Sequence, residues 1–132
     1  MSTIFFHNFV QSIKTSAARK NKTILVINIL SLVFNLASWL FLYFKFKQIL
    51  ADKSSDIVPL HYNIYLGIDL QDKWWKAFIM PFWGTIFFIF NYLLALSLFH
   101  KKSLVSYFLS AVNLFLQLTI LAACIFTLLL NI

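Results

Sequence analysis

Three long apolar segments without any charged residue dominate the hydropathy pattern of the chain. They cover residues 23–44, 77–99 and 104–130. A helix needs about 20 apolar residues to cross the hydrocarbon core of a bilayer, and each segment is long enough to do so. The pattern predicts an all-α membrane protein, in which three transmembrane helices form a single domain over residues 1–132.

A weaker periodicity precedes the first apolar segment. Over residues 3–18, apolar residues recur at steps of three and four, with polar residues on the opposite side. This pattern predicts an amphipathic helix that lies on the membrane surface. A frayed terminus is the alternative. The segment 23–44 is longer than the core of a signal peptide, which has about 7–15 residues, and this indicates an uncleaved anchor. The apolar side of the predicted surface helix comprises Phe6, Phe9, Val10, Ile13 and Ala17.

Each apolar segment carries polar or small residues at steps of three, four or seven. Such steps place side chains on one face of a helix. Because lipid cannot satisfy an amide group, we expect these faces to point toward the other helices. The stripes comprise Asn28, Ser31, Asn35 and Ser38 in the first segment, Gly84, Asn91 and Ala95 in the second, and Ser106, Ser110, Asn113, Gln117 and Cys124 in the third.

The amides of these stripes predict an interhelical polar network inside the bundle. Its expected members are Asn28, Asn35, Asn91, Asn113 and Gln117. At about 1.5 Å of rise per residue, the last four lie at similar depth, and we expect them to meet in one buried layer. A polar path for an ion or small solute is the alternative. Such paths usually contain an ionisable residue, and these segments contain none.

The polar segment 45–76 contains an alternating stretch that runs from Val58 to Leu70. Strict alternation is typical of extended chain with one apolar face. A single strand of this length would be too long for the loop, so we expect a bend over residues 63–67 that gives either a short hairpin or a folded-back extended segment. The apolar edge is expected to rest on the helix ends. The other edge would present His61, Asn63 and Asp69.

Charge is scarce and unevenly placed. Charged residues make up 11% of the chain, against about 25% in soluble domains, so a lipid bilayer is the expected solvent for most of the surface. The net charge of +7 does not predict nucleic-acid binding. The basic residues flank the apolar segments and form no basic face.

The basic residues also predict an orientation. Five lie in the loop 45–76, and six lie in short acid-free segments on the other side: Lys14, Arg19, Lys20, Lys22, Lys101 and Lys102. By the positive-inside rule, the N-terminus is expected in the cytoplasm, with the loop and the C-terminus outside. Tryptophans prefer the headgroup level. An aromatic belt on the loop side would comprise Trp39, Trp74, Trp75 and Trp83.

Candidate chemistry adds little to this picture. The sequence offers no nucleophile–base pair, paired carboxylates or phosphate loop, so we assign no catalytic residue and do not expect an enzyme. His61 with the loop aspartates makes at most a weak metal site, and neither a metal nor a cofactor is expected. Cys124 is the only cysteine, which excludes an intrachain disulfide.

The loop resembles a known family in its order of residues. Residues 57–63 read Ile-Val-Pro-Leu-His-Tyr-Asn, and Gly67, Asp69 and Lys73 follow. This resembles the loop signature of a widespread bacterial membrane domain of unknown function, in which Ile-Pro-x-His-Phe-Asn, a Gly, an Asp and a Lys follow a first membrane span. A second span comes next there, often with an early Pro, and Pro81 fits that feature.

The resemblance covers about residues 24–97 and has departures. Tyr62 stands in place of the usual Phe, and the spacing from Asn63 to Gly67 is slightly longer. The same domain opens the SdpI-like immunity proteins, which protect a bacterium from its own secreted killing peptide and which are larger, with further spans. The resemblance implies a bacterial plasma-membrane location with the signature loop outside.

Together these observations predict a binding, accessory or immunity-type role. The loop is the expected recognition surface for a membrane protein or a peptide, because order and polar variety concentrate there. Its recognition candidates are Pro59, His61, Tyr62, Asn63, Gly67 and Asp69. The alternative is a transport or channel subunit, in which the polar stripes line a path between the protomers of a homo-oligomer.

Overall fold

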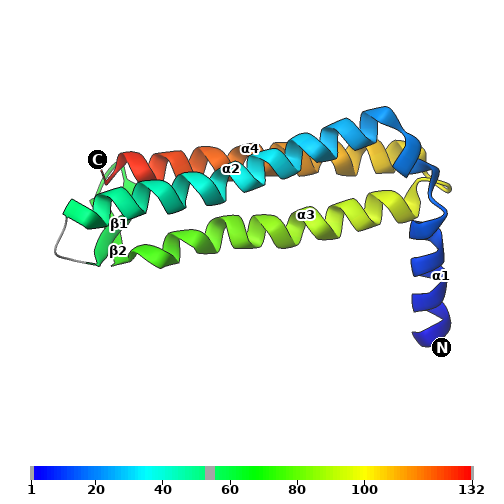
Figure 1. Ribbon diagram of the computed structural model, residues 1–132, viewed down its shortest axis with the longest axis horizontal. Coiled ribbons are helices and arrows are strands. Elements are labelled where there is room, and N and C mark those ends of the chain that lie inside the picture. Colours follow the sequence, from blue (N-terminus) through cyan, green and yellow to red (C-terminus); the bar gives the residue numbers. More distant parts are fainter. Residues whose placement is uncertain (1, 53–55, 132) are drawn as a thin grey trace.

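The computed structural model describes residues 2–52 and 56–131. Three long helices lie side by side along one axis, with a short helix at one end and a two-stranded sheet at the other (Figure 1). In chain order the elements are α1 (Ser2–Lys14), the 3-10 turn η1 (Ala17–Lys20), α2 (Lys22–Asp52), β1 (Ile57–Asn63), β2 (Gly67–Lys73), the 3-10 turn η2 (Trp74–Phe78), α3 (Ile79–Leu98) and α4 (Ser103–Leu129).

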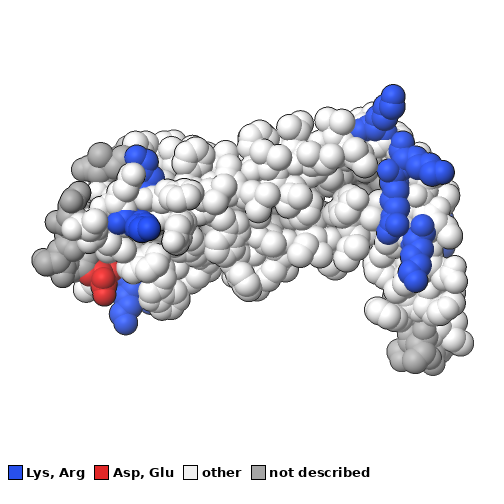
Figure 2. Space-filling model, in the orientation of Figure 1, with Lys and Arg blue, Asp and Glu red and all other residues white. Residues whose placement is uncertain are grey.

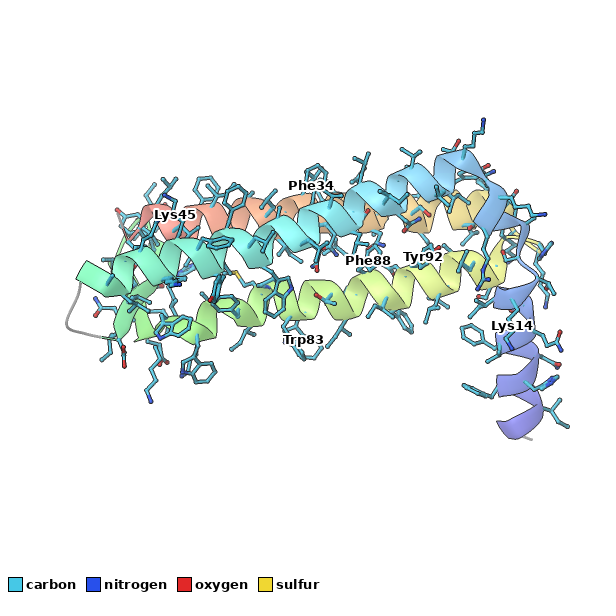
Figure 3. The ribbon with its side chains drawn as sticks, in the orientation of Figure 1. Lys14, Phe34, Lys45, Trp83, Phe88 and Tyr92 are labelled. Atoms are coloured by element: carbon cyan, nitrogen blue, oxygen red, sulfur yellow. The ribbon has the colours of Figure 1, made fainter. Side chains whose placement is uncertain are left out.

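The three predicted long helices are confirmed. By length and composition, α2, η2 with α3, and α4 are each long and apolar enough to cross a membrane. Large apolar side chains cover the outer faces of the bundle along its length (Figure 3). Phe44, Phe90 and Phe115 are 57%, 60% and 71% exposed. Exposed apolar surface on this scale marks contact with lipid or with other proteins.

The first helix is longer than predicted. We expected residues 45–52 to belong to the loop, but α2 continues to Asp52. Phe46, which lies in this extension, is fully buried. The extra turns therefore form because they bury an apolar side chain under the sheet, although Lys45 and Lys47 interrupt the hydropathy of the segment.

The buried interior differs between the ends and the middle of the bundle. An apolar cluster at the end that carries the sheet, called here the hairpin end, comprises Leu42, Phe46, Val58, Ala77, Cys124 and Leu128. A smaller cluster at the α1 end comprises Ala18, Ile24 and Leu96. Between them the helices meet mainly through small and polar side chains, which let the backbones approach closely.

Helix α1 stands away from the bundle and lies roughly across its axis (Figure 1). The predicted helix 3–18 is too long, because α1 ends at Lys14. The Ser16 hydroxyl donates to the carbonyl oxygen of Leu96 on α3 at 2.6 Å and accepts from the backbone N–H of Ala18 at 3.2 Å. These bonds fix an extended residue at Ser16 and turn the chain from α1 into the bundle.

Candidate functional site

The turn of the hairpin depends on two residues. Gly67 has φ +75°, a left-handed conformation that glycine adopts at little cost. The side-chain oxygen of Asn63 accepts a hydrogen bond from the backbone N–H of Tyr65 at 2.8 Å. These features reverse the chain across residues 64–66, and β1 and β2 pair antiparallel. The predicted bend over residues 63–67 is confirmed, and of the two expected forms the structure has the hairpin.

The base of the hairpin is fixed to the helices. Val58 is fully buried in the apolar cluster of the hairpin end. The amide nitrogen of Asn131, just past α4, donates to the carbonyl oxygen of Pro59 at 2.7 Å. The backbone N–H of Trp74 donates to the carbonyl oxygen of Asp56 at 3.2 Å. The hairpin is thus held by the chain segments on both sides of it and by the end of α4.

The distal half of the hairpin carries an exposed apolar patch. We expected the whole apolar edge to rest on the helix ends, and this is wrong beyond Leu60. The strand pairing is irregular between Pro59 and Tyr62, where proline has no N–H to donate, and side chains beyond this irregularity leave the bundle. The patch, called here the distal patch, comprises Tyr62, Ile64, Tyr65, Leu66, Ile68 and Leu70, with exposures from 44% at Ile68 to 91% at Tyr65.

A histidine–aspartate pair lies beside the distal patch. Nδ1 of His61 on β1 is 2.7 Å from Oδ1 of Asp69 on β2, and the two side chains are 62% and 29% exposed. An exposed pair of this kind adds little to stability, so its main consequence is a polar group of fixed geometry at the surface. Within residues 2–52 and 56–131, no group of three His, Cys, Asp or Glu side chains is placed to hold a metal ion.

The six recognition candidates divide into two groups. His61, Tyr62 and Asp69 present their side chains to the surface. Asn63 and Gly67 form the turn, and the carbonyl oxygen of Pro59 is bonded to Asn131. The second group therefore builds the hairpin, while the first group and the apolar tip can contact a partner. The apolar tip is visible in the sequence only as a continuation of the alternating pattern.

The joint between β2 and the following helix is an ion pair. The ammonium group of Lys76 in η2 donates to the carboxylate of Asp72. The backbone N–H of Lys73 also donates to that carboxylate, at 2.8 Å. These two hydrogen bonds hold the pKa of the Asp72 carboxyl below its ordinary value of 3.8, and the bond from Lys76 has the larger effect.

The interior amides form two layers instead of the single layer that we expected. In the layer nearer the α1 end, Nδ2 of Asn28 donates to the Ser110 hydroxyl at 2.9 Å, and Nδ2 of Asn113 donates to Oδ1 of Asn28 at 3.2 Å. In the other layer, Nδ2 of Asn35 donates to Oε1 of Gln117 at 3.0 Å. Asn28 and Asn35 lie two helical turns apart, roughly 10 Å, so the layers are separate.

The second layer also includes α3, through Gly84 of the expected stripe and through Thr85, which the sequence pattern did not indicate. The Thr85 hydroxyl donates to Oδ1 of Asn35 at 2.9 Å and accepts from the indole N–H of Trp39 at 3.3 Å. Nε2 of Gln117 donates to the carbonyl oxygen of Gly84 at 2.9 Å. Trp39 was expected in an interfacial aromatic belt, but its N–H points into the bundle.

Asn91 is the one expected network member that the structure leaves apart. Its side chain is half-buried and makes no hydrogen bond within the described part of the chain. Asn113 reaches the backbone carbonyl of Phe88 on α3 instead, at 3.4 Å. The stripe of α3 therefore contributes backbone carbonyls where it was expected to contribute an amide.

Comparisons with known proteins give no match: no family model, no curated protein and no solved structure matches this chain. The resemblance of residues 57–73 to the bacterial loop signature therefore stays a prediction, and the geometry of the hairpin and the bundle carries the functional argument.

Proposed function

We propose that this protein is a multi-pass membrane protein of the bacterial plasma membrane, with α2, η2–α3 and α4 as its spans. Two observations support this: the apolar outer surface of three long helices and the inward direction of their amides. Helix α1, set across the bundle axis, lies along the membrane surface. The N-terminus is cytoplasmic, and the hairpin and the C-terminus are outside, since the α1 end holds the acid-free basic segments.

In this orientation the hairpin binds a partner outside the membrane. The observation that carries this proposal is an apolar patch that is ordered and yet unused in folding: the hairpin is anchored through Val58 and Pro59, while Tyr65 is 91% exposed. The outer edge of β2 in this two-stranded sheet would accept an extended peptide by strand addition. The partner is a membrane protein or a membrane-active peptide, and an immunity-type role is one form of this function.

Site-specific crosslinking tests the proposal. A photoreactive phenylalanine derivative replaces Tyr65 in the distal patch, and a matched variant carries it at Phe108, which is 69% exposed on α4 near the α1 end. Irradiation of intact cells should give a protein or peptide adduct from position 65 only. The adduct should weaken when His61 and Asp69 are replaced by Ala with abundance unchanged. Equal adducts from both positions, or lipid adducts alone, would refute hairpin binding.

The same adducts test the alternative of an oligomeric channel subunit. Asn28, Asn35, Asn113 and Gln117 are at most 4% exposed and are bonded within one protomer. No observation favours a path lined by these residues between protomers. A homodimer adduct formed from position 108, on the outer face of α4, would show self-association and would support the channel-subunit alternative.

A further inference from the structure

The α1 end of the molecule carries basic residues without any acid. On the face in Figure 2, blue side chains gather at this end without any red, whereas blue and red lie together at the hairpin end. All four acids of the chain lie between residues 52 and 72. The basic residues of the α1 end are Lys14, Arg19, Lys20, Lys22, Lys101 and Lys102. They create a positive potential that attracts anions at this end, where no acid offsets it.

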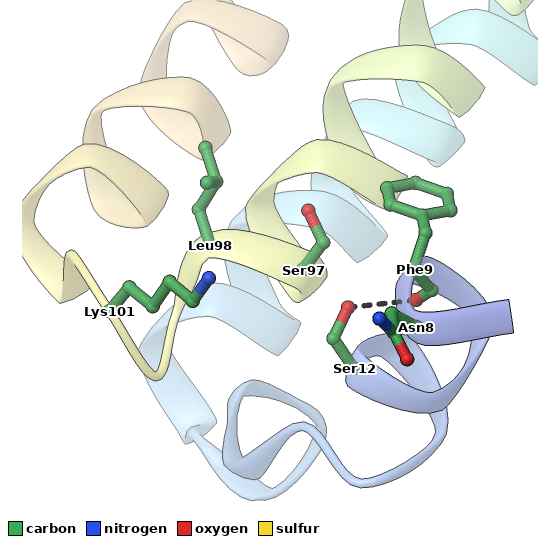
Figure 4. A pocket seen from close by; sticks show the side chains of 6 residues that line it. All are labelled: Asn8, Phe9, Ser12, Ser97, Leu98 and Lys101. Atoms are coloured by element: carbon green, nitrogen blue, oxygen red, sulfur yellow. Dashed lines mark hydrogen bonds between the residues drawn. The ribbon is translucent and has the colours of Figure 1, made fainter. Parts of the chain in front are cut away.

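A cleft of about 330 Å³ opens at this end, where α1 meets the end of α3 and the turn that follows it. Figure 4 shows the Lys101 side chain extending toward this space, with Ser97 and Ser12 around it. The hydroxyls of Ser12 and Ser97 donate to carbonyl oxygens of their own helices at 2.7 and 3.0 Å. The cleft is lined by Asn8, Phe9, Ser12, Ser97, Leu98 and Lys101.

The polar lining has unused binding capacity. Lys101 forms no ion pair within residues 2–52 and 56–131, and the exposed amide of Asn8 makes no hydrogen bond to a described residue. An ammonium group and an amide N–H are donors that suit a phosphate oxygen. Phe9 and Leu98 add an apolar wall to the same cleft. The lining therefore fits a ligand with an anionic phosphate and an apolar tail.

We propose that this cleft, the α1–α3 cleft, binds the phosphate headgroup of an anionic phospholipid, with an acyl chain along Phe9 and Leu98. The cleft lies at the end of the span that closes at Leu98, which is the headgroup level if that span crosses a bilayer. The inference rests on the proposed membrane location and not on the partner of the hairpin. A bound lipid would add a bridge between α1 and α3, whose junction is otherwise held by the Ser16–Leu96 and His100–Thr15 hydrogen bonds and by the packing of Ile13 against the cluster of Leu96.

The test uses the full chain in a neutral detergent, with Tm and native mass spectrometry as readouts. Phosphatidylglycerol should raise Tm by about 3 °C or more, because a ligand of the folded state stabilises it. Phosphatidylcholine with the same chains, and inorganic phosphate, should each do less. Equal stabilisation by phosphatidylcholine would overturn recognition of an anionic headgroup. Full stabilisation by inorganic phosphate would overturn the lipid assignment in favour of a soluble anion.

Two adjacent lysines supply a matched pair of variants. Lys101→Gln should weaken phosphatidylglycerol binding on the order of tenfold, as expected for loss of one charge-assisted bond. Lys102→Gln removes the same charge from a residue outside the lining and should change binding less than about twofold. Ser12→Leu fills the cleft and keeps both lysines, and it should abolish phosphatidylglycerol binding. An equal loss of phosphatidylglycerol binding in both lysine variants would show diffuse electrostatic attraction and would overturn the cleft as a specific site. The crosslinking adducts formed from position 65 of the hairpin would be unaffected by this outcome.

Discussion

At the scale of single residues, the bundle depends on a few positions where three helices meet closely. Gly84 is the tightest of them. A Cβ atom at this position would lie 2.7 Å from Cδ1 of Ile120, and 3.1 Å from both Nδ2 of Asn35 and Oε1 of Gln117. Gly84 thus permits the amide contact between α2 and α4 to form against the backbone of α3.

Gly84→Ala should therefore destabilise the protein, although alanine favours a helix. Overpacking costs about 1–3 kcal/mol and the helix preference of Ala offsets roughly 0.5–1 kcal/mol, which leaves a net loss of about 1 kcal/mol. Ile120→Val removes the atom at 2.7 Å and should restore part of the loss in the double variant. Unfolding in mixed micelles with increasing SDS measures this, and a more stable Gly84→Ala variant would contradict the close packing.

Asn35 lies in the hydrogen-bond network and Asn91 lies outside it. Comparing their alanine variants tests whether an amide stabilises the bundle through its hydrogen bonds or merely by being polar. Asn35→Ala leaves Oε1 of Gln117 buried without its donor, which should cost about 1–3 kcal/mol. Asn91→Ala should change stability by less than about 0.5 kcal/mol, since Asn91 makes no hydrogen bond within the described residues. The same SDS titration compares them. If Asn91→Ala lost as much stability as Asn35→Ala, the amide of Asn91 on α3 would belong to the network after all.

At the scale of elements, the hairpin is a short sheet that depends on the bundle. A two-stranded hairpin is marginally stable alone in water, and only its base packs on the helices through Val58, with Leu60 partly buried beside it. The joint to α3 is secured by Asp72, which is bonded to Lys76 and to the backbone of Lys73. The exposed tip can thus be altered without loss of the fold, whereas the base cannot.

Val58→Ser should loosen the hairpin while leaving the helices intact. It removes a fully buried apolar side chain, and the expected cost is about 1–3 kcal/mol. Hydrogen exchange of the backbone amides in residues 57–73 should accelerate, with little change in α2 and α4. Ile57→Ser is the control, because Ile57 is 57% exposed. If both variants exchange alike, Val58 does not anchor the sheet.

The Asp72 joint predicts a dependence on acid. Because the folded-state pKa of Asp72 is depressed, its stabilising contribution is complete above about pH 4 and is lost as the pH falls through the folded pKa. Lys76→Gln should raise that pKa toward 3.8, since the largest cause of its depression is removed. Carboxyl carbon shifts of Asp72 in an NMR titration report both values. An identical midpoint in the variant would exclude Lys76 as the cause.

At the scale of the whole molecule, the two ends differ in charge and shape, and this difference predicts a single orientation in the membrane. Native Cys124 is fully buried and should not react with a membrane-impermeant maleimide. With Cys124→Ser as background, cysteine at Tyr65 should react in intact cells. Cysteine at Leu104, which is 81% exposed at the α1 end, should react only after permeabilisation. The reverse labelling pattern would invert the proposed topology.

The three helices, the chain reversal in the loop and the inward faces are predictable from the sequence, because each leaves a local signal: a long apolar run, an alternating stretch, or polar residues at steps of three and four. Steps of three and four residues place Asn28, Asn35, Asn113 and Gln117 on helix faces, and alternation from Val58 to Leu70 is typical of extended chain. The helical extension of α2 to Asp52 was missed, because lysines there obscure the burial of Phe46.

Which of these groups meet depends on the tertiary packing. The relative rotation and shift of α2, α3 and α4 split the amides into two layers, left Asn91 aside and brought in Thr85. Likewise, local alternation could not reveal that the bundle supports only the base of the hairpin, leaving Tyr65 exposed. Periodicity fixes the face on which a side chain lies, but the partner it meets depends on how separate elements pack.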